Sequence, residues 1–246
     1  PPRGKLQLNE LGEPIYGERD QADLEKMRAL GLPFWLAGGY RSPEKLRAAL
    51  HAGAAGVQVG TAFAYCAESG LRAGYKQAVL DKVLSGEARV FTDPVASPTG
   101  FPFKVVQLEG SLSENKVFAA RPRICDLGYL REAYRTAEGA IGYRCPAEPP
   151  TLYVHKGGTL EHTIGRKCVC NALMSNIGHP QVRNHKYVEA GLVTSGNDLV
   201  GIARFLPPIG TKYSAADVLS KLLHDYWPAR FVRQPVNDAE RIPALS

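Results

Sequence analysis

Two short apolar runs near the start of the chain each end in a glycine turn, and a helix signal follows each turn. Phe34 to Ala37 leads into Gly38-Gly39, and Val57 to Val59 leads into Gly60-Thr61. Strands separated by one helix and short loops run parallel, with a right-handed crossover. Uninterrupted apolar strands are typical of parallel sheets that are covered on both faces. We therefore predict an α/β fold for this part of the chain.

The helices around these strands have recognisable start and stop signals. Asp20 is a candidate cap for a helix that precedes the first strand. Ser42 is a good N-cap for the helix between the strands, Pro43 suits its first position, and Gly53 ends it. A further helix is expected from about residue 71 to residue 84. The first helix should bury a stripe formed by Leu24, Met27 and Leu30.

From about Arg89 onward the composition changes, with more proline and glycine and fewer helical signals. We expect a helix that starts at Asp126 and runs through Gly139, and structured loops over residues 144–150 and 155–171. Ser214 and Asp217 mark the start of a last helix, and residues after Trp227 are expected to form an extended tail. The inward face of that last helix should hold Val218, Leu219, Leu222 and Leu223. We predict two units, 1–88 and 89–246, the second a loop-rich, mixed α+β unit.

The bulk composition is that of an ordinary globular protein. Hydrophobic residues make up 44% of the 246 residues and charged residues 22%. The chain lacks the roughly 18 consecutive apolar residues of a membrane span, and the first residues lack the apolar core of a signal peptide. The 30 basic and 24 acidic residues are interspersed, which does not favour nucleic-acid binding. With an odd number of cysteines, five, a cytoplasmic protein without a disulfide framework is expected.

Four of the five cysteines lie in the second unit, with the spacing C-x19-C-x22-C-x-C. They are Cys125, Cys145, Cys168 and Cys170. Four thiolates suit zinc or an iron–sulfur cluster, but paired C-x2-C units are the usual zinc spacing. Buried, unreactive cysteine is the commoner state. We predict no metal site and leave metal binding by these four residues open.

The two glycine turns fall where parallel α/β folds bind ligands, at the carboxyl ends of the strands. Glycine lets the backbone approach a ligand closely and adopt positive φ. Free N–H groups at the start of the next helix suit a phosphate, and Thr61 adds a hydroxyl. Together the turns at 38–39 and 60–61 predict a phosphate cup.

The segment from Pro33 to Gly70 resembles the nitronate monooxygenase family, formerly called 2-nitropropane dioxygenases. The residues that carry the resemblance are Leu36-Ala37-Gly38-Gly39, the run Gly53 to Phe63 (GAAGVQVGTAF) and Glu68-Ser69. Family members are FMN-dependent TIM barrels. The resemblance implies a flavin-dependent monooxygenase that oxidises alkyl nitronates with dioxygen. It also implies that Gly38, Gly39, Gly60 and Thr61 hold the FMN phosphate, with Ala37 and Gln58 beside the flavin.

The chain departs from the family pattern at its start. Family members carry an upstream histidine, often in a Gly-Gly-His turn, that acts as the base near the flavin, and no such turn occurs here. We therefore expect the C-terminal portion of a TIM (βα)8 barrel with an appended unit. A missing N-terminal half or a second polypeptide would complete the barrel and supply the base. A homo-oligomer of the complete enzyme is expected, and the catalytic residue stays unassigned.

Two other functions remain open. Related flavin barrels reduce enoyl thioesters with NAD(P)H, and NADPH consumption without a need for oxygen would indicate that activity. A noncatalytic subunit or binding module is the third possibility, and a colourless protein with stoichiometric zinc would favour it. Lys104, in the segment GFPFK, is interpreted as a loop cation.

Overall fold

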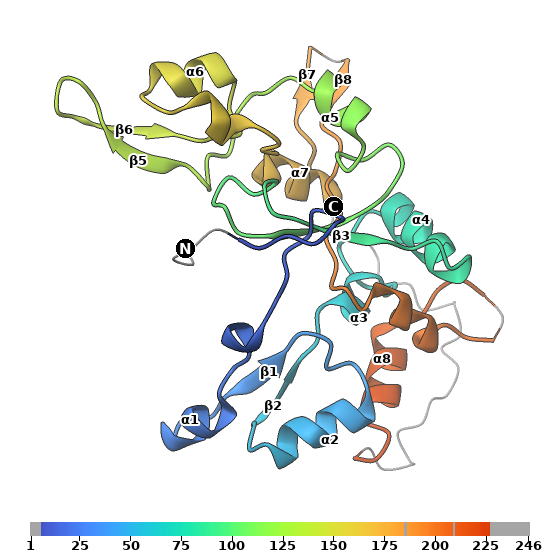
Figure 1. Ribbon diagram of the computed structural model, residues 1–246. Coiled ribbons are helices and arrows are strands. Elements are labelled where there is room, and N and C mark those ends of the chain that lie inside the picture. Colours follow the sequence, from blue (N-terminus) through green and yellow to red (C-terminus); the bar gives the residue numbers. More distant parts are fainter. Residues whose placement is uncertain (1–5, 185, 209, 227–246) are drawn as a thin grey trace, which may run out of the picture.

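The computed structural model describes residues 6–184, 186–208 and 210–226 (Figure 1). Its first elements are η1 (Glu18–Asp20), α1 (Leu24–Ala29), β1 (Trp35–Ala37), α2 (Pro43–His51), β2 (Gly56–Gln58), α3 (Thr61–Ala64) and α4 (Ala73–Leu84). They are followed by β3 (Val90–Asp93), β4 (Phe103–Val106), α5 (Asn115–Ala120), β5 (Glu132–Arg135), β6 (Ile141–Arg144) and α6 (Pro150–His155). The last are η2 (Leu160–Thr163), α7 (Val169–Asn176), β7 (Val182–Arg183), β8 (Tyr187–Val188), η3 (Leu199–Phe205) and α8 (Ala215–Leu222). The architecture is mixed α/β, as predicted.

The strands β1 and β2 pair in parallel, with Leu36 opposite Val57 and Ala37 opposite Gln58. The helix α2 connects them, and Ser42 Oγ caps it by accepting from the Lys45 amide at 3.4 Å. Its buried face packs on the strands through a small core of Phe34, Ala49 and Ala54. The predicted strand–helix–strand unit is therefore confirmed. The three other sheets of the described residues are antiparallel pairs, β3–β4, β5–β6 and β7–β8, and these residues form no closed barrel.

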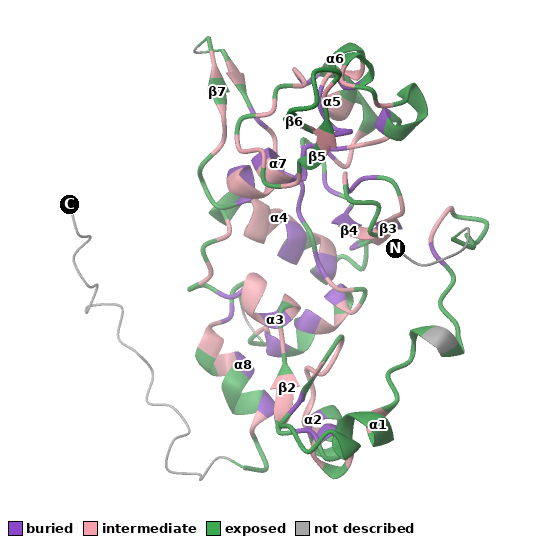
Figure 2. Cartoon of the chain, turned by 90° about the vertical axis from the view of Figure 1, so that its left-hand side faces the viewer, coloured by how far each residue is buried: buried purple, intermediate pink, exposed green. Residues whose placement is uncertain are grey.

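The helix α1 starts three residues later than predicted and buries none of its residues. Asp23, not Asp20, caps it, because the Asp23 carboxylate accepts from the Lys26 amide at 3.1 Å. Asp20 instead ends η1 and accepts from the Gly17 amide at 2.8 Å. The expected inward stripe is exposed at two of its three positions, at Met27 (38%) and Leu30 (66%). Figure 2 shows α1 at the edge of the molecule, away from the buried residues around α3 and α4.

The prediction of a helix from Asp126 through Gly139 is wrong, because this segment contains β5 and the turn of the β5–β6 hairpin. Gly139 takes a φ of +85° in the turn, where the Thr136 amide donates to the Ala140 carbonyl at 2.8 Å. The Asp126 carboxylate contacts side chains far along the chain, Asn171 at 2.9 Å and Arg183. Because the Asp126 carboxylate is bound to these long-range partners, it does not cap a helix.

The segment interpreted as a loop over residues 155–171 contains the start of a buried helix, α7. Polar side chains lie on its buried face, and each reaches a distant carbonyl. Ser175 Oγ donates to the Glu189 carbonyl at 2.7 Å, and Asn176 Nδ2 donates to the Leu192 carbonyl at 2.8 Å. Because the buried face is partly polar, it has no apolar periodicity that sequence reasoning can detect.

The last helix, α8, begins as predicted. Ser214 and Asp217 form a capping box, and the Glu68 carboxylate accepts from the Ala215 amide at 2.9 Å. Of the residues expected to face inward, Val218 and Leu222 are buried, whereas Leu219 is 38% exposed. The predicted tail after Trp227 lies outside the described residues.

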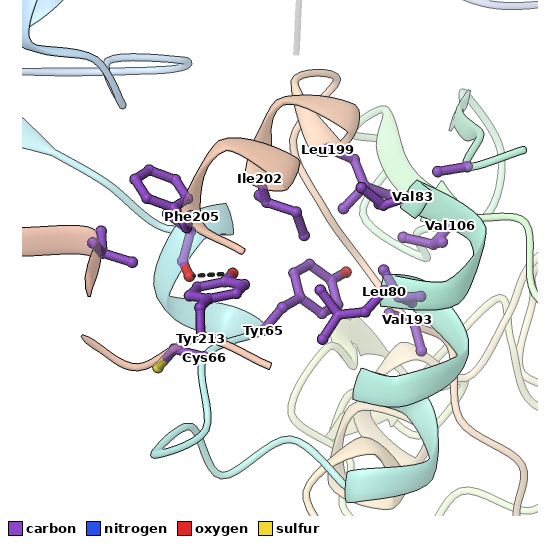
Figure 3. Packing of buried hydrophobic residues seen from close by; sticks show 14 of the residues in the cluster. Tyr65, Cys66, Leu80, Val83, Val106, Val193, Leu199, Ile202, Phe205 and Tyr213 are labelled. Carbon is purple, nitrogen blue, oxygen red and sulfur yellow. Dashed lines mark hydrogen bonds between the residues drawn. The ribbon is translucent and has the colours of Figure 1, made fainter. Parts of the chain in front are cut away.

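The largest core joins α3 and α4 to η3 and α8 (Figure 3). Tyr65, Leu80 and Val83 face Leu199 and Ile202 across this core. Tyr213 Oη also donates to the Ala62 carbonyl at 2.6 Å. Figure 1 accordingly places α8 beside α2 and α3, far from it in sequence. The core draws on both sides of residue 88, and the division of the chain there stays a prediction.

Within the described ranges, no helix is long and apolar enough to cross a membrane.

Candidate functional site

A hollow of about 110 Å³ lies at the carboxyl ends of β1 and β2. Three segments line it: the turn after β1, the turn after β2, and residues 196 and 198 of the distant C-terminal part. Five of the six residues predicted to bind the cofactor are among the lining residues, namely Gly38, Gly39, Gln58, Gly60 and Thr61. Ala37 pairs with Gln58 at the end of β1 but does not line the hollow. The two glycine turns thus face one common space.

The backbone at these turns leaves room and donors for a ligand. Gly38 and Gly39 have φ values of +91° and +85°, which side chains other than glycine rarely tolerate. A Cβ placed on Gly38 or Gly60 would meet no atom within 4 Å. Within the described part of the chain, the amides of Gly39, Gly60 and Thr61 donate no hydrogen bond. Unpaired amides beside open space are the arrangement that binds an anion.

The start of α3 contributes the Gly60 and Thr61 amides rather than a large helix dipole. Gly60 is its N-cap residue, and no side chain caps it. Because α3 has only four residues, few peptide dipoles add up along it. The attraction for an anion here is therefore local hydrogen bonding by free N–H groups.

A segment that sequence reasoning missed closes the third side of the hollow. The Gly196 amide donates to Thr61 Oγ1 at 3.1 Å, so the Thr61 hydroxyl accepts this bond and keeps its own hydrogen to donate. A Cβ on Gly196 would lie 2.9 Å from Thr61 Oγ1, so only glycine permits this approach. No local pattern connects Gly196 with a turn 135 residues earlier.

Arg41, Lys45 and Asp198 are the charged groups nearest the glycine turns. Arg41 forms an ion pair with Asp198, and both side chains are about one-fifth exposed. The Arg41 Nε is buried and has no hydrogen-bond partner in the part of the chain that the structure describes. Lys45 Nζ lies 3.4 Å from the position that a Cβ on Gly39 would take. The Arg41–Asp198 pair is neutral as a unit, so Lys45 leaves a net positive charge beside the glycine turns. The position of Arg41, directly after the first glycine turn, was the available sequence signal for it.

Lys104 lies close to the same hollow and is not simply a loop cation. Its Nζ donates to Asn197 Oδ1 at 2.6 Å and to Thr92 Oγ1 at 3.2 Å. Asn197 stands between two lining residues of the hollow. Burial lowers the pKa of Lys104, while the nearby charge of Glu13 acts in the opposite direction.

Larger hollows occur elsewhere, but among the described residues none of them lies between two glycine turns at the ends of strands. One of about 460 Å³ lies along α4, lined by Tyr65, Gln77 and Leu80 among others. Lys76 also lines it, but its ammonium already binds three backbone carbonyls, those of Cys66, Ala67 and Ser69. We therefore take the smaller hollow between the glycine turns as the candidate site.

Comparisons with known proteins agree with this choice of region. Residues 12–97 match the family model described as nitronate monooxygenase. A nitronate monooxygenase of Pseudomonas aeruginosa PAO1 is 36% identical over 94 residues, which is 37% of this chain. The chain spans only 27% of that relative's length. No solved structure matches the chain. The resemblance expected from the sequence is thus confirmed over residues 12–97, which include both glycine turns.

Proposed function

We propose that this chain is part of an FMN-dependent oxidoreductase of the nitronate monooxygenase type, which oxidises alkyl nitronates with dioxygen. Its contribution is to anchor the FMN phosphate. The observation that carries the proposal is the hollow between the two glycine turns, because it lies in the segment that resembles the family and combines open space with unpaired amides.

The residues of the hollow fit a phosphate group. Gly38, Gly39, Gly60 and Thr61 would hold it through backbone N–H groups and one hydroxyl, and Lys45 would offset its charge. Asp198 would repel a phosphate if it were alone, but Arg41 neutralises it. A hollow of about 110 Å³ is far smaller than the binding pockets of drug-sized ligands, which are about 300–1,000 Å³. The flavin ring must therefore lie outside it. When bound, FMN supplies the redox chemistry, and the protein supplies position and electrostatics.

The rest of the barrel is proposed to come from a missing N-terminal half or from a partner polypeptide. The sheet β1–β2 has only two strands, which is marginal without further partners. Apolar side chains around it are exposed, including Leu32 (69%) and Trp35 (60%). Such a patch favours coverage by another part of the enzyme. The catalytic base, the oligomeric state and the division into units 1–88 and 89–246 belong to the same proposal.

The test compares two glycine-to-alanine substitutions in the complete protein that contains this chain. Gly60→Ala adds a methyl group to the hollow without backbone strain, since Gly60 has a φ of −101° and a Cβ there meets no protein atom. We expect FMN to bind about tenfold more weakly or worse, measured by flavin fluorescence. Gly74→Ala makes the same chemical change in α4, again with open space around it, and should leave FMN affinity unchanged.

Equal FMN affinity in the wild type and in Gly60→Ala would contradict the proposed anchor. Nitronate-dependent oxygen consumption by the wild type tests the reaction itself. Oxidation of NADPH with an enoyl thioester in place of that activity would replace the proposed reaction with the reductase alternative.

A further inference from the structure

The four cysteines of the second part of the chain, Cys125, Cys145, Cys168 and Cys170, converge at the start of α7. Cys145 and Cys168 pack in one buried cluster with Ala147. Cys168 is the N-cap residue of α7, and Cys170 lies in its first turn. This region forms the upper half of the molecule in Figure 1 and lies outside the segment that resembles nitronate monooxygenase.

One side chain of α7 brings the remaining cysteine to the same place. Asn171 Nδ2 donates to the Ile124 carbonyl at 3.2 Å and to Asp126 Oδ2 at 2.9 Å. These partners flank Cys125 in the chain, so Asn171 holds the Cys125 loop against the first turn of α7. Three separate segments therefore deliver thiols to one location, although the sequence spaces them over 46 residues.

The burial of these cysteines fits a site between packed segments. Cys145 and Cys168 are buried, and Cys125 and Cys170 are half-buried. The four thiols therefore lie at the boundary between the Cys125 loop, the turn after β6 and the first turn of α7.

Buried positive charge lies beside these cysteines. It is a second observation, separate from the placement of the thiols. The Arg121 side chain is 1% exposed, and only its Nε is bound, to Glu189 Oε1 at 2.6 Å. Within the described residues, Arg121 Nη1 and Nη2 are buried without an acceptor, which is costly for charged donors. Lys167, next to Cys168 in the chain, is also buried, and its Nζ donates to the Leu112 carbonyl at 2.9 Å. The same ammonium lies 4.2 Å from the centroid of the Phe118 ring in α5, the helix whose C-cap residue is Arg121. Glu189 pairs with Arg121, whereas Lys167 forms no ion pair within the described residues, although the charge of Asp93 acts on it.

We propose that Cys125, Cys145, Cys168 and Cys170 bind one zinc ion as a tetrathiolate centre. On binding, four S–H bonds break, four zinc–sulfur bonds form and four protons leave to solvent, with no change of oxidation state. The resulting centre carries two negative charges, which offset Arg121 and Lys167 and provide acceptors near the unpaired guanidinium N–H groups. Soft thiolate ligands select zinc over calcium or magnesium.

Binding requires a small closure of the site. As the side chains stand in the described residues, no three His, Cys, Asp or Glu side chains are placed to hold a metal ion. Rotation of cysteine side chains between staggered rotamers moves each sulfur around its Cα–Cβ bond. The closure would tie the loop at 124–126 and the turn at 145–148 to α7, in a region whose sheets have only two strands each.

The experiment measures metal content and ligand type in the full chain, purified under reducing conditions without chelator. Mass spectrometry of the metals should give about one zinc per chain, and X-ray absorption should give a shell of sulfur alone at ~2.3 Å. Cys145→Ser and Cys168→Ser should each lose most of the zinc. Cys66→Ser is the matched control, because Cys66 is an equally buried free cysteine in the separate core around α3, and it should keep the metal.

A measurement on the wild type alone keeps the proposal testable even if the variants fail to fold. Cobalt added to the metal-free chain should give an intense thiolate-to-cobalt absorption band together with the visible bands of a tetrahedral site. The proposal is overturned if wild-type protein binds neither zinc nor cobalt, if the shell contains few sulfurs, if Cys66→Ser loses as much zinc as Cys168→Ser, or if the protein contains iron and labile sulfide instead.

Discussion

The segment over residues 12–97 and the segment over residues 98–226 are organised in opposite ways. In the first, caps and glycine turns lie next to the elements that they shape, as Ser42 does for α2. In the second, the shaping contacts come from far along the chain, as Asn171 does for the loop at Cys125. Both segments leave apolar side chains exposed, but the buried charged side chains of the described residues, Arg121, Glu148, Lys167 and Glu189, all lie in the second. The contrast teaches that a segment built on local signals is easy to interpret from sequence, whereas one that buries charged groups depends on partners found only by folding.

The largest effect is expected when the buried Arg121–Glu189 ion pair of the second segment is broken. Arg121→Met leaves Glu189 buried and uncompensated, and breaking such a pair costs about 3–5 kcal/mol. We expect that decrease in the free energy of unfolding, measured by urea denaturation. The double variant Arg121→Met with Glu189→Met should recover much of the loss, since neither member of the pair then leaves an uncompensated buried charge. Arg28→Met, which removes an exposed pair with Glu25 in the first segment, should cost at most about 0.5 kcal/mol. Similar losses in the two single variants would break the comparison.

The next effect compares apolar side chains in the two segments. Ile202 is fully buried in the core around α4, and Leu30 is 66% exposed at the end of α1. Ile202→Ala should lower the free energy of unfolding by about 2–5 kcal/mol because it leaves a cavity. Leu30→Ala should change it by about 0.5 kcal/mol or less. A large cost for Leu30→Ala in the isolated chain would mean that α1 already has a partner there.

The smallest effect is expected from two substitutions in the first segment, one at a glycine with positive φ and one at a glycine with ordinary φ. Their comparison isolates the cost of backbone strain. Gly38→Ala places a Cβ in open space but at a φ of +91°, and the left-handed region costs roughly 1–2 kcal/mol for such a residue. Gly60→Ala places one in open space at an ordinary φ and should leave the free energy of unfolding nearly unchanged. Thermal unfolding of the two variants checks this difference, and equal destabilisation would show that the turn at Gly60 also needs glycine for its conformation.

Prediction from sequence succeeded where the determining contact was local. The parallel pair β1–β2, the cap at Ser42 and the start of α8 at Ser214 each follow from residues within a few positions. It failed at Asp126 and across α7, because side chains there bind partners 45 and 16 residues away. The same distinction applies to the candidate site, where the glycine turns were predicted but Arg41, Gly196 and Asp198 were not.

The sequence by itself therefore determined that two neighbouring strands end in glycine turns able to face a ligand, because strand, turn and helix signals act over a few residues. Only the tertiary structure decided what stands opposite those turns. The Gly196 amide reaches Thr61, and Asp198 reaches Arg41, across more than a hundred residues. In the same way, only folding packs Cys145 with Cys168 and holds the Cys125 loop against the first turn of α7. Which groups meet across such separations depends on how the cores pack, and local patterns carry no information about that.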